Sequence, residues 1–194
     1  MLVTLAKFEI KNLIRDRMTL VMLLWPLILG AIGKYLISSG VLEGQAVSVT
    51  AMVLSLITGF AYGAMSGFSL LDDRDDQVFA SIQISPVSLD FYVWFKIAFV
   101  YVLAVLASYF MLWIVEAAAM SIFETLVVSA LLALQVPIVA LLVNAFAKNK
   151  VEGFVAMKAS AFLMLLPIAG FFFLDAKEWL FAIAPGHWAA KAIQ

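Results

Sequence analysis

The fold is decided by an apolar stretch over residues 92–115, YVWFKIAFVYVLAVLASYFMLWIV, in which Lys96 is the only charged residue. A helix rises about 1.5 Å per residue, so roughly 20 apolar residues cross the ~30 Å hydrocarbon core of a bilayer. Four other stretches have similar length and character, namely 18–38, 47–71, 125–147 and 151–174. The sequence therefore predicts an all-α membrane protein with about five transmembrane helices.

The composition agrees with a chain that lies in lipid. Hydrophobic residues make up 65% of the 194 residues, charged residues only 13%, and the mean hydropathy is +1.09, whereas soluble domains carry about 25% charged residues. The net charge of −1 offers no basic surface for nucleic acid. Cysteine is absent and His187 is the single histidine, so we expect no catalytic residue, cofactor or metal site in this chain.

The distribution of Lys and Arg predicts the orientation, because loops on the cytoplasmic side carry the excess of positive charge. Seven basic residues fall on one side (Lys7, Lys11, Arg15, Arg17, Arg74, Lys148 and Lys150) and three on the other (Lys34, Lys177 and Lys191). We therefore expect a multi-pass protein of the cell (inner) membrane with its N-terminus in the cytoplasm. Lys96 and Lys158 lie one or two turns inside their helices, and we expect their long side chains to reach back to cytoplasmic water.

Residues 1–17 show a helical period before the first transmembrane stretch. One arc of this helix is apolar, and the opposite arc carries Lys7, Lys11, Asn12 and Arg15. This pattern predicts an amphipathic helix in the membrane interface, with its basic side toward anionic lipid headgroups. A simple membrane anchor would show the same pattern.

Small residues recur every four positions in the second transmembrane stretch, at Ser55, Gly59, Gly63 and Gly67. Such a stripe lets two helix backbones approach closely inside a bilayer. The sequence favours helix packing within the chain over a seam between two copies, but it does not identify the contact.

The most distinctive segment, residues 72–91, begins DDRDDQVFASIQISPVS. Its apolar residues after the acidic cluster predict a short helix with an acidic start, which Ser85-Pro86 ends because a residue before proline avoids the helical region. The pattern lacks the ligand spacing of a calcium loop. Two interpretations remain: a capped helix resting on the membrane surface, or a docking element for a cytoplasmic partner.

Four features together resemble the permease subunits of type-2 ATP-binding-cassette (ABC) exporters. These are the basic amphipathic N-terminal helix, the run from Asp73-Arg74-Asp75 through Ser85-Pro86-Val87-Ser88 to Lys96, the turn Asn149–Gly153, and the segment Trp179–Trp188. The resemblance covers nearly the whole chain, although each motif is loose. It implies an elbow helix at 1–17, a cytoplasmic coupling helix within 72–91, and an outer-leaflet re-entrant hairpin at 175–194 that precedes a sixth span. This sixth span is absent from the sequence.

In that family the coupling helix sits in a groove of a separate ATPase subunit. Carried over by position, the residues that form or cap this contact are Asp73, Arg74, Asp75, Phe79, Ile82, Ser85 and Pro86. The sequence departs from the family where many members have Gly-Thr-Leu-Glu and this chain has Gln77-Val78-Phe79-Ala80. The resemblance further implies two cytoplasmic ATPase subunits that bind ATP and Mg²⁺, and a second permease copy or paralogue.

Energy for transport would have to come from such a partner, because the sequence contains no Gly-x-x-x-x-Gly-Lys-Ser/Thr phosphate loop. We therefore expect a non-enzymatic subunit, and the resemblance implies that it moves a drug-like, lipid or other amphipathic substrate out of the cell. Two alternatives remain: a secondary carrier, for which ionisable residues at broken helices near the midplane would be expected, and a non-transporting membrane scaffold or assembly protein.

Overall fold

A computed structural model describes residues 2–115, 120–173 and 179–193, and the chain is helical over most of these ranges. Part of the expected re-entrant segment, namely residues 175–178 (with Lys177) and residue 194, lies outside the described residues. The helices are α1 (Leu2–Arg15), α2 (Arg17–Ser38), α3 (Gln45–Asp75), α4 (Val78–Gln83), α5 (Leu89–Val115), α6 (Ile122–Ala133), α7 (Gln135–Phe146), α8 (Lys150–Ser160), α9 (Phe162–Phe172) and α10 (His187–Ile193).

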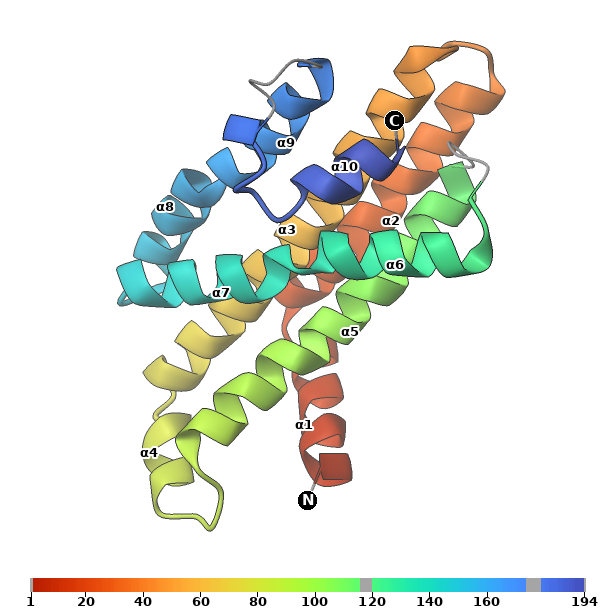
Figure 1. Ribbon diagram of the computed structural model, residues 1–194. Coiled ribbons are helices and arrows are strands. Elements are labelled where there is room, and N and C mark those ends of the chain that lie inside the picture. The colour runs from red at the N-terminus through yellow and green to blue at the C-terminus, as the bar shows by residue number, and fades with distance from the viewer. Residues whose placement is uncertain (1, 116–119, 174–178, 194) are drawn as a thin grey trace.

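Five helical segments are long and apolar enough to cross a membrane, which confirms the predicted all-α membrane fold. They are α2, α3, α5, the pair α6–α7 over Ile122–Phe146, and the pair α8–α9 over Lys150–Phe172. In Figure 1 the short helix α4 joins α3 to α5 at the lower end of the molecule, and α1 lies near the same end. We call this the α4 end.

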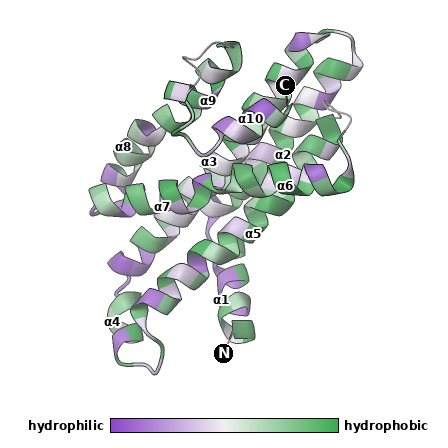
Figure 2. Ribbon diagram, in the orientation of Figure 1, coloured by the Kyte–Doolittle hydropathy of each residue, from purple (hydrophilic) through white to green (hydrophobic). Residues whose placement is uncertain are grey.

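Helix α3 forms the centre of the bundle and packs against α2, α5 and α7. Large apolar side chains such as Trp113 and Leu106 are instead exposed on the outside, and Figure 2 shows hydrophobic residues along the whole length of the long helices. Exposed apolar surface on this scale is that of a protein surrounded by lipid.

The fourth membrane-crossing segment is broken at Leu134, between α6 and α7. Pro137 has no backbone N–H, so the carbonyl of Ala133 loses its usual partner four residues later. At the break the Leu134 N–H donates to the Leu131 carbonyl, three residues earlier, at 3.2 Å. Gln135, directly after this break, is completely buried.

Asp16 separates α1 from α2 and caps the second helix, where its carboxylate accepts the backbone N–H of Thr19 at 2.9 Å. Burial raises the pKa of Asp16, but the hydrogen bonds from Thr19 outweigh this effect and hold the pKa below its ordinary value. The cap therefore keeps its charge, and the chain turns between the N-terminal helix and the first membrane-crossing helix.

The described part of the C-terminal segment folds back against the bundle. Helix α10 packs on α9, α6 and α3, and Trp179 contacts Trp188 edge to face at 5.6 Å between ring centroids. A Cβ placed on Gly186 would lie 2.5 Å from the Cδ2 atom of Leu56 in α3, so the turn at Pro185-Gly186 approaches the central helix closely. Its position in the outer leaflet stays a prediction.

Candidate functional site

The last turn of α3 anchors three different helices through consecutive residues. Asp72 pairs with α8, Asp73 pairs with α5, and Arg74 donates to the end of α7. We call Asp72, Asp73 and Arg74 the α3 hub. Since α4 follows directly, the hub connects this short helix to most of the bundle.

Asp73 occupies a buried cluster of polar groups. Its carboxylate forms an ion pair with the ammonium of Lys96 and accepts a hydrogen bond from the Tyr92 hydroxyl at 3.0 Å. The Lys96 ammonium also donates to the Ser69 carbonyl at 3.2 Å and lies 3.7 Å from the Glu9 carboxylate of α1. Helices α1, α3 and α5 therefore meet at one buried cation.

The position of Lys96 corrects an expectation from the sequence. Its side chain is only 1% exposed and does not reach back to water. The physical reason is local compensation, because Asp73 and Glu9 replace the hydration of the ammonium group. Lys158, for which the same expectation was made, is exposed.

Arg74 and Asp72 tie the turn between α7 and α8 to the end of α3. The Arg74 guanidinium donates to the Ala147 carbonyl at 3.1 Å and to the Asn144 carbonyl at 3.4 Å, both at the C-terminus of α7. A cation is favourable there because the last carbonyls of a helix carry partial negative charge. The Asp72 carboxylate lies 2.8 Å from the Lys150 ammonium at the start of α8.

The sequence predicted that the acidic cluster starts the short helix, but it does not. Asp72, Asp73 and Asp75 belong to the last turn of α3, whereas α4 begins at Val78. Gln77 separates the two helices with a φ of +57°, in the left-handed region. The reason for the difference is that inward-facing partners hold the hub residues in α3 and outweigh the dipole preference for a place at the start of α4.

The predicted coupling residues of 72–91 divide between the interior and the surface. Phe79 turns inward, edge to face with Tyr92 at 6.4 Å between centroids, and Ile82 is half-buried. The Ser85 hydroxyl donates to the Ile82 carbonyl at 2.7 Å and accepts the Val87 N–H at 3.2 Å, so it shapes the turn before α5. Asp75 and Pro86 are exposed.

Ile84 is the most exposed large apolar side chain at this end, with 91% of its surface accessible. It lies at the tip of the α4–α5 connection, one residue beyond the end of the helix. Ile84 was not among the coupling residues predicted from the sequence.

The stripe of small residues on α3 faces α6 and α7. A Cβ on Gly59 would lie 2.6 Å from the Leu132 carbonyl oxygen, and one on Gly63 would lie 2.8 Å from the Val139 Cβ. On Gly67 it would lie 2.9 Å from the Val143 Cβ, and Ser55, one turn earlier, is fully buried. The close approach along this stripe is therefore a contact within the chain.

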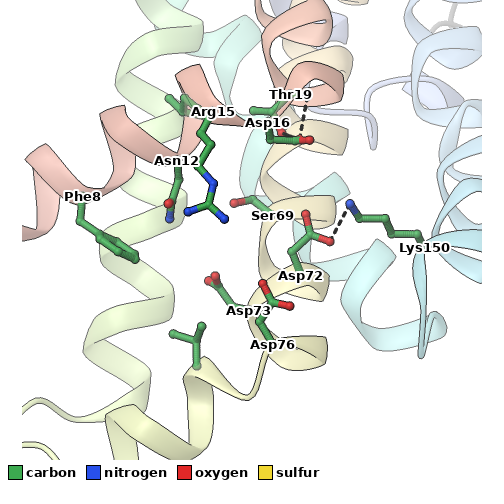
Figure 3. Close-up of a pocket in the computed structure, with 12 residues that line it drawn as sticks. Phe8, Asn12, Arg15, Asp16, Thr19, Ser69, Asp72, Asp73, Asp76 and Lys150 are labelled. Atoms are coloured by element: carbon green, nitrogen blue, oxygen red, sulfur yellow. Dashed lines mark hydrogen bonds and ion pairs between the residues drawn. The ribbon is translucent and has the colours of Figure 1, made fainter.

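A cavity of about 460 Å³ opens beside the hub between α1, α3 and α8. Figure 3 shows the Arg15 side chain of α1 on one side of it, and Asp73 and Asp76 on the other. Phe8, Asn12 and Leu13 also line it from α1. Within the described residues no group of three or more His, Cys, Asp or Glu side chains is arranged to hold a metal ion.

Comparison with known proteins assigns the family. A family model described as "Fluoroquinolones export permease protein Rv2686c-like" matches residues 9–194. The chain belongs to this family of export permeases. The membership confirms the resemblance to exporter permeases drawn from the sequence, and the match includes the hub, α4 and Glu9.

Two curated relatives of this permease are the fluoroquinolones export permease proteins MT2760 and Rv2686c from Mycobacterium tuberculosis, strains CDC 1551 / Oshkosh and ATCC 25618 / H37Rv. Each is 28% identical over 137 residues, which cover 67% of this chain and 52% of the relative. The chain thus spans about half the length of the curated relatives it matches. No solved structure matches it.

Sequence reasoning missed two members of the buried cluster around Asp73, namely Glu9 and the buried Lys96. Glu9 carries a signal that could have found it, because it lies three residues after Ala6 and four before Leu13, on the apolar arc of α1. An acid on an apolar arc calls for a buried partner. Lys96 could have supplied that partner, since it is the only charged residue of the apolar stretch 92–115.

Proposed function

We propose that this chain is a membrane subunit of an ATP-driven ABC exporter that works with separate cytoplasmic ATPase subunits and a second permease copy or paralogue. The α4 end would face the cytoplasm, in agreement with the excess of Lys and Arg there. ATP and Mg²⁺ would be bound by the ATPase subunits. The transported compound would be amphipathic, and since the relatives are named for export of fluoroquinolones, these drugs are the first substrates to test.

The observation that carries the proposal is the mounting of α4 on the α3 hub. The exposed Ile84 offers an apolar knob to a partner, while Phe79 fixes α4 to Tyr92 on its inner side. A force on this knob would pass to the end of α3. The hub would then distribute it to α5, α7 and α8 through Asp73, Arg74 and Asp72.

Site-specific crosslinking tests the contact directly, because the natural chain has no cysteine. A tagged Ile84→Cys variant should crosslink in native membranes to a polypeptide that carries a phosphate loop and hydrolyses ATP. The matched control is Ile122→Cys at the start of α6, an isoleucine that is also strongly exposed (79%) and should not crosslink to the ATPase. The proposal is wrong if no ATPase copurifies with the tagged chain and Ile84→Cys gives no such product.

Reconstitution separates the exporter from a carrier. Vesicles that contain the permease and its ATPase should accumulate a fluoroquinolone only when ATP is present on the ATPase side. Uptake driven by an ion gradient with the permease alone would instead identify a secondary carrier.

A further inference from the structure

Glu9 has an unusual position for a carboxylate. It belongs to α1, outside the five membrane-crossing segments, yet only 2% of it is exposed. Its Oε1 atom has no hydrogen-bond partner, and the nearest cation, the Lys96 ammonium, is 3.7 Å away. The lysine instead bonds directly to Asp73 and to the Ser69 carbonyl.

The charges around Glu9 do not balance. Two carboxylates, Glu9 and Asp73, face the single ammonium of Lys96. Asp73 also accepts a hydrogen bond from the Tyr92 hydroxyl, so it is the carboxylate that pairs directly with the Lys96 ammonium. On α1 itself the basic residues Lys7, Lys11 and Arg15 are exposed, and Asp16, at the start of α2, is occupied with Thr19.

We propose that Glu9 is a proton-binding site that controls the docking of α1 on α3 and α5. With a proton bound, the Glu9 carboxyl is neutral and the buried cluster holds one anion and one cation. Without the proton, the cluster holds an uncompensated buried anion, which is costly at low dielectric. The cavity beside the hub, which the neighbouring Asp73 lines, offers this proton a route to the exterior.

The sign of the pH dependence follows from the environment of Glu9. Burial raises its pKa above the ordinary value of 4.5, and the opposing attraction of Lys96 does not cancel this effect. Docked α1 therefore binds more protons than released α1 in the pH window between the ordinary carboxyl pKa and the raised docked value. Docking is strongest below this window, weakens as pH rises through it, and is constant above it.

Thiol labelling measures the docking of α1 without any ATPase, so its outcome is independent of the proposed transport function. Leu13→Cys places a thiol on the buried side of α1, and Lys11→Cys places one on its exposed side. The ratio of their maleimide reaction rates in the purified full chain cancels the intrinsic pH dependence of the thiol. The rate at Leu13→Cys divided by the rate at Lys11→Cys should rise from acidic to alkaline pH, by roughly tenfold for each unit by which docking raises the Glu9 pKa.

Two background substitutions make the interpretation specific. Glu9→Gln mimics the protonated carboxyl, and the ratio should then stay low at every pH. Asp73→Asn removes the competing carboxylate, leaves Lys96 to pair with Glu9, and should shift the rise to lower pH. The proposal is overturned if the ratio in the natural background is flat, or if Glu9→Gln leaves the rise unchanged.

Discussion

At the scale of single residues, Gln77 ends α3 in a conformation that suits glycine. Its φ of +57° lies in the left-handed region, and its N–H bonds to the Arg74 carbonyl at 3.2 Å. A non-glycine residue pays about 1 kcal/mol there because its Cβ crowds the backbone. Glycine is also the residue that many type-2 exporter permeases place at this position.

We therefore expect Gln77→Gly to stabilise the chain by up to about 1 kcal/mol. Gln77→Val should destabilise it, because a β-branched side chain tolerates positive φ poorly. Thermal unfolding in detergent measures both changes. If Gln77→Gly unfolds at a lower temperature than the natural chain, the α3–α4 turn does not have this conformation.

Lys96 gives a second residue-scale prediction. Lys96→Met should destabilise the chain by about 3–5 kcal/mol, because it leaves Asp73 buried without its cation. Lys158→Met, at an exposed lysine, is the matched control and should change stability by less than about 0.5 kcal/mol. Equal losses for the two variants in unfolding by denaturing detergent would contradict the buried cluster.

At the scale of helices, the packing of α3 depends on what each glycine faces. A Cβ on Gly59 would meet the backbone carbonyl oxygen of Leu132 at 2.6 Å, whereas on Gly153 it would meet the ends of the Leu71 and Phe68 side chains at 2.8 and 2.9 Å. Side-chain ends can move aside, but a helix backbone cannot without displacing the whole helix.

Gly59→Ala should therefore cost about 1–3 kcal/mol, and Gly153→Ala clearly less. Unfolding of the two variants in the same detergent compares them directly. A larger loss for Gly153→Ala would show that α6 and α7 do not approach α3 as described.

The helices themselves were predictable from the sequence, but the hub was not. Long apolar runs dictate membrane-crossing helices, but the break between α6 and α7 within the stretch 125–147 was not predicted. In contrast, the approach of Glu9 to Lys96 joins residues far apart in the chain, and no local period encodes it. The acidic residues were assigned to the wrong helix because their partners on α5 and α8 only become visible in three dimensions.

At the scale of the whole molecule, the ion pair between Asp72 and Lys150 should matter more for transport than for folding. Both side chains are partly exposed, and such a pair contributes at most about 1 kcal/mol to stability. Asp72→Lys should nevertheless lower transport per ATP hydrolysed by about fivefold or more in the reconstituted exporter, because it detaches α8 from the hub.

The reversed pair, Asp72→Lys with Lys150→Asp, is the control and should recover most of this loss. Simultaneous measurement of drug uptake and phosphate release gives the ratio. If the single variant transports normally per ATP, the link from α3 to α8 does not take part in the transport cycle.

The α3 hub also determines the kind of motion that the bundle can make. Consecutive residues of a helix point about 100° apart, so Asp72, Asp73 and Arg74 hold α8, α5 and α7 on different sides of α3. Helix α4 follows directly after the end of α3. We therefore expect a lateral force on α4 to act as a torque about the axis of α3 and to move α5, α7 and α8 together.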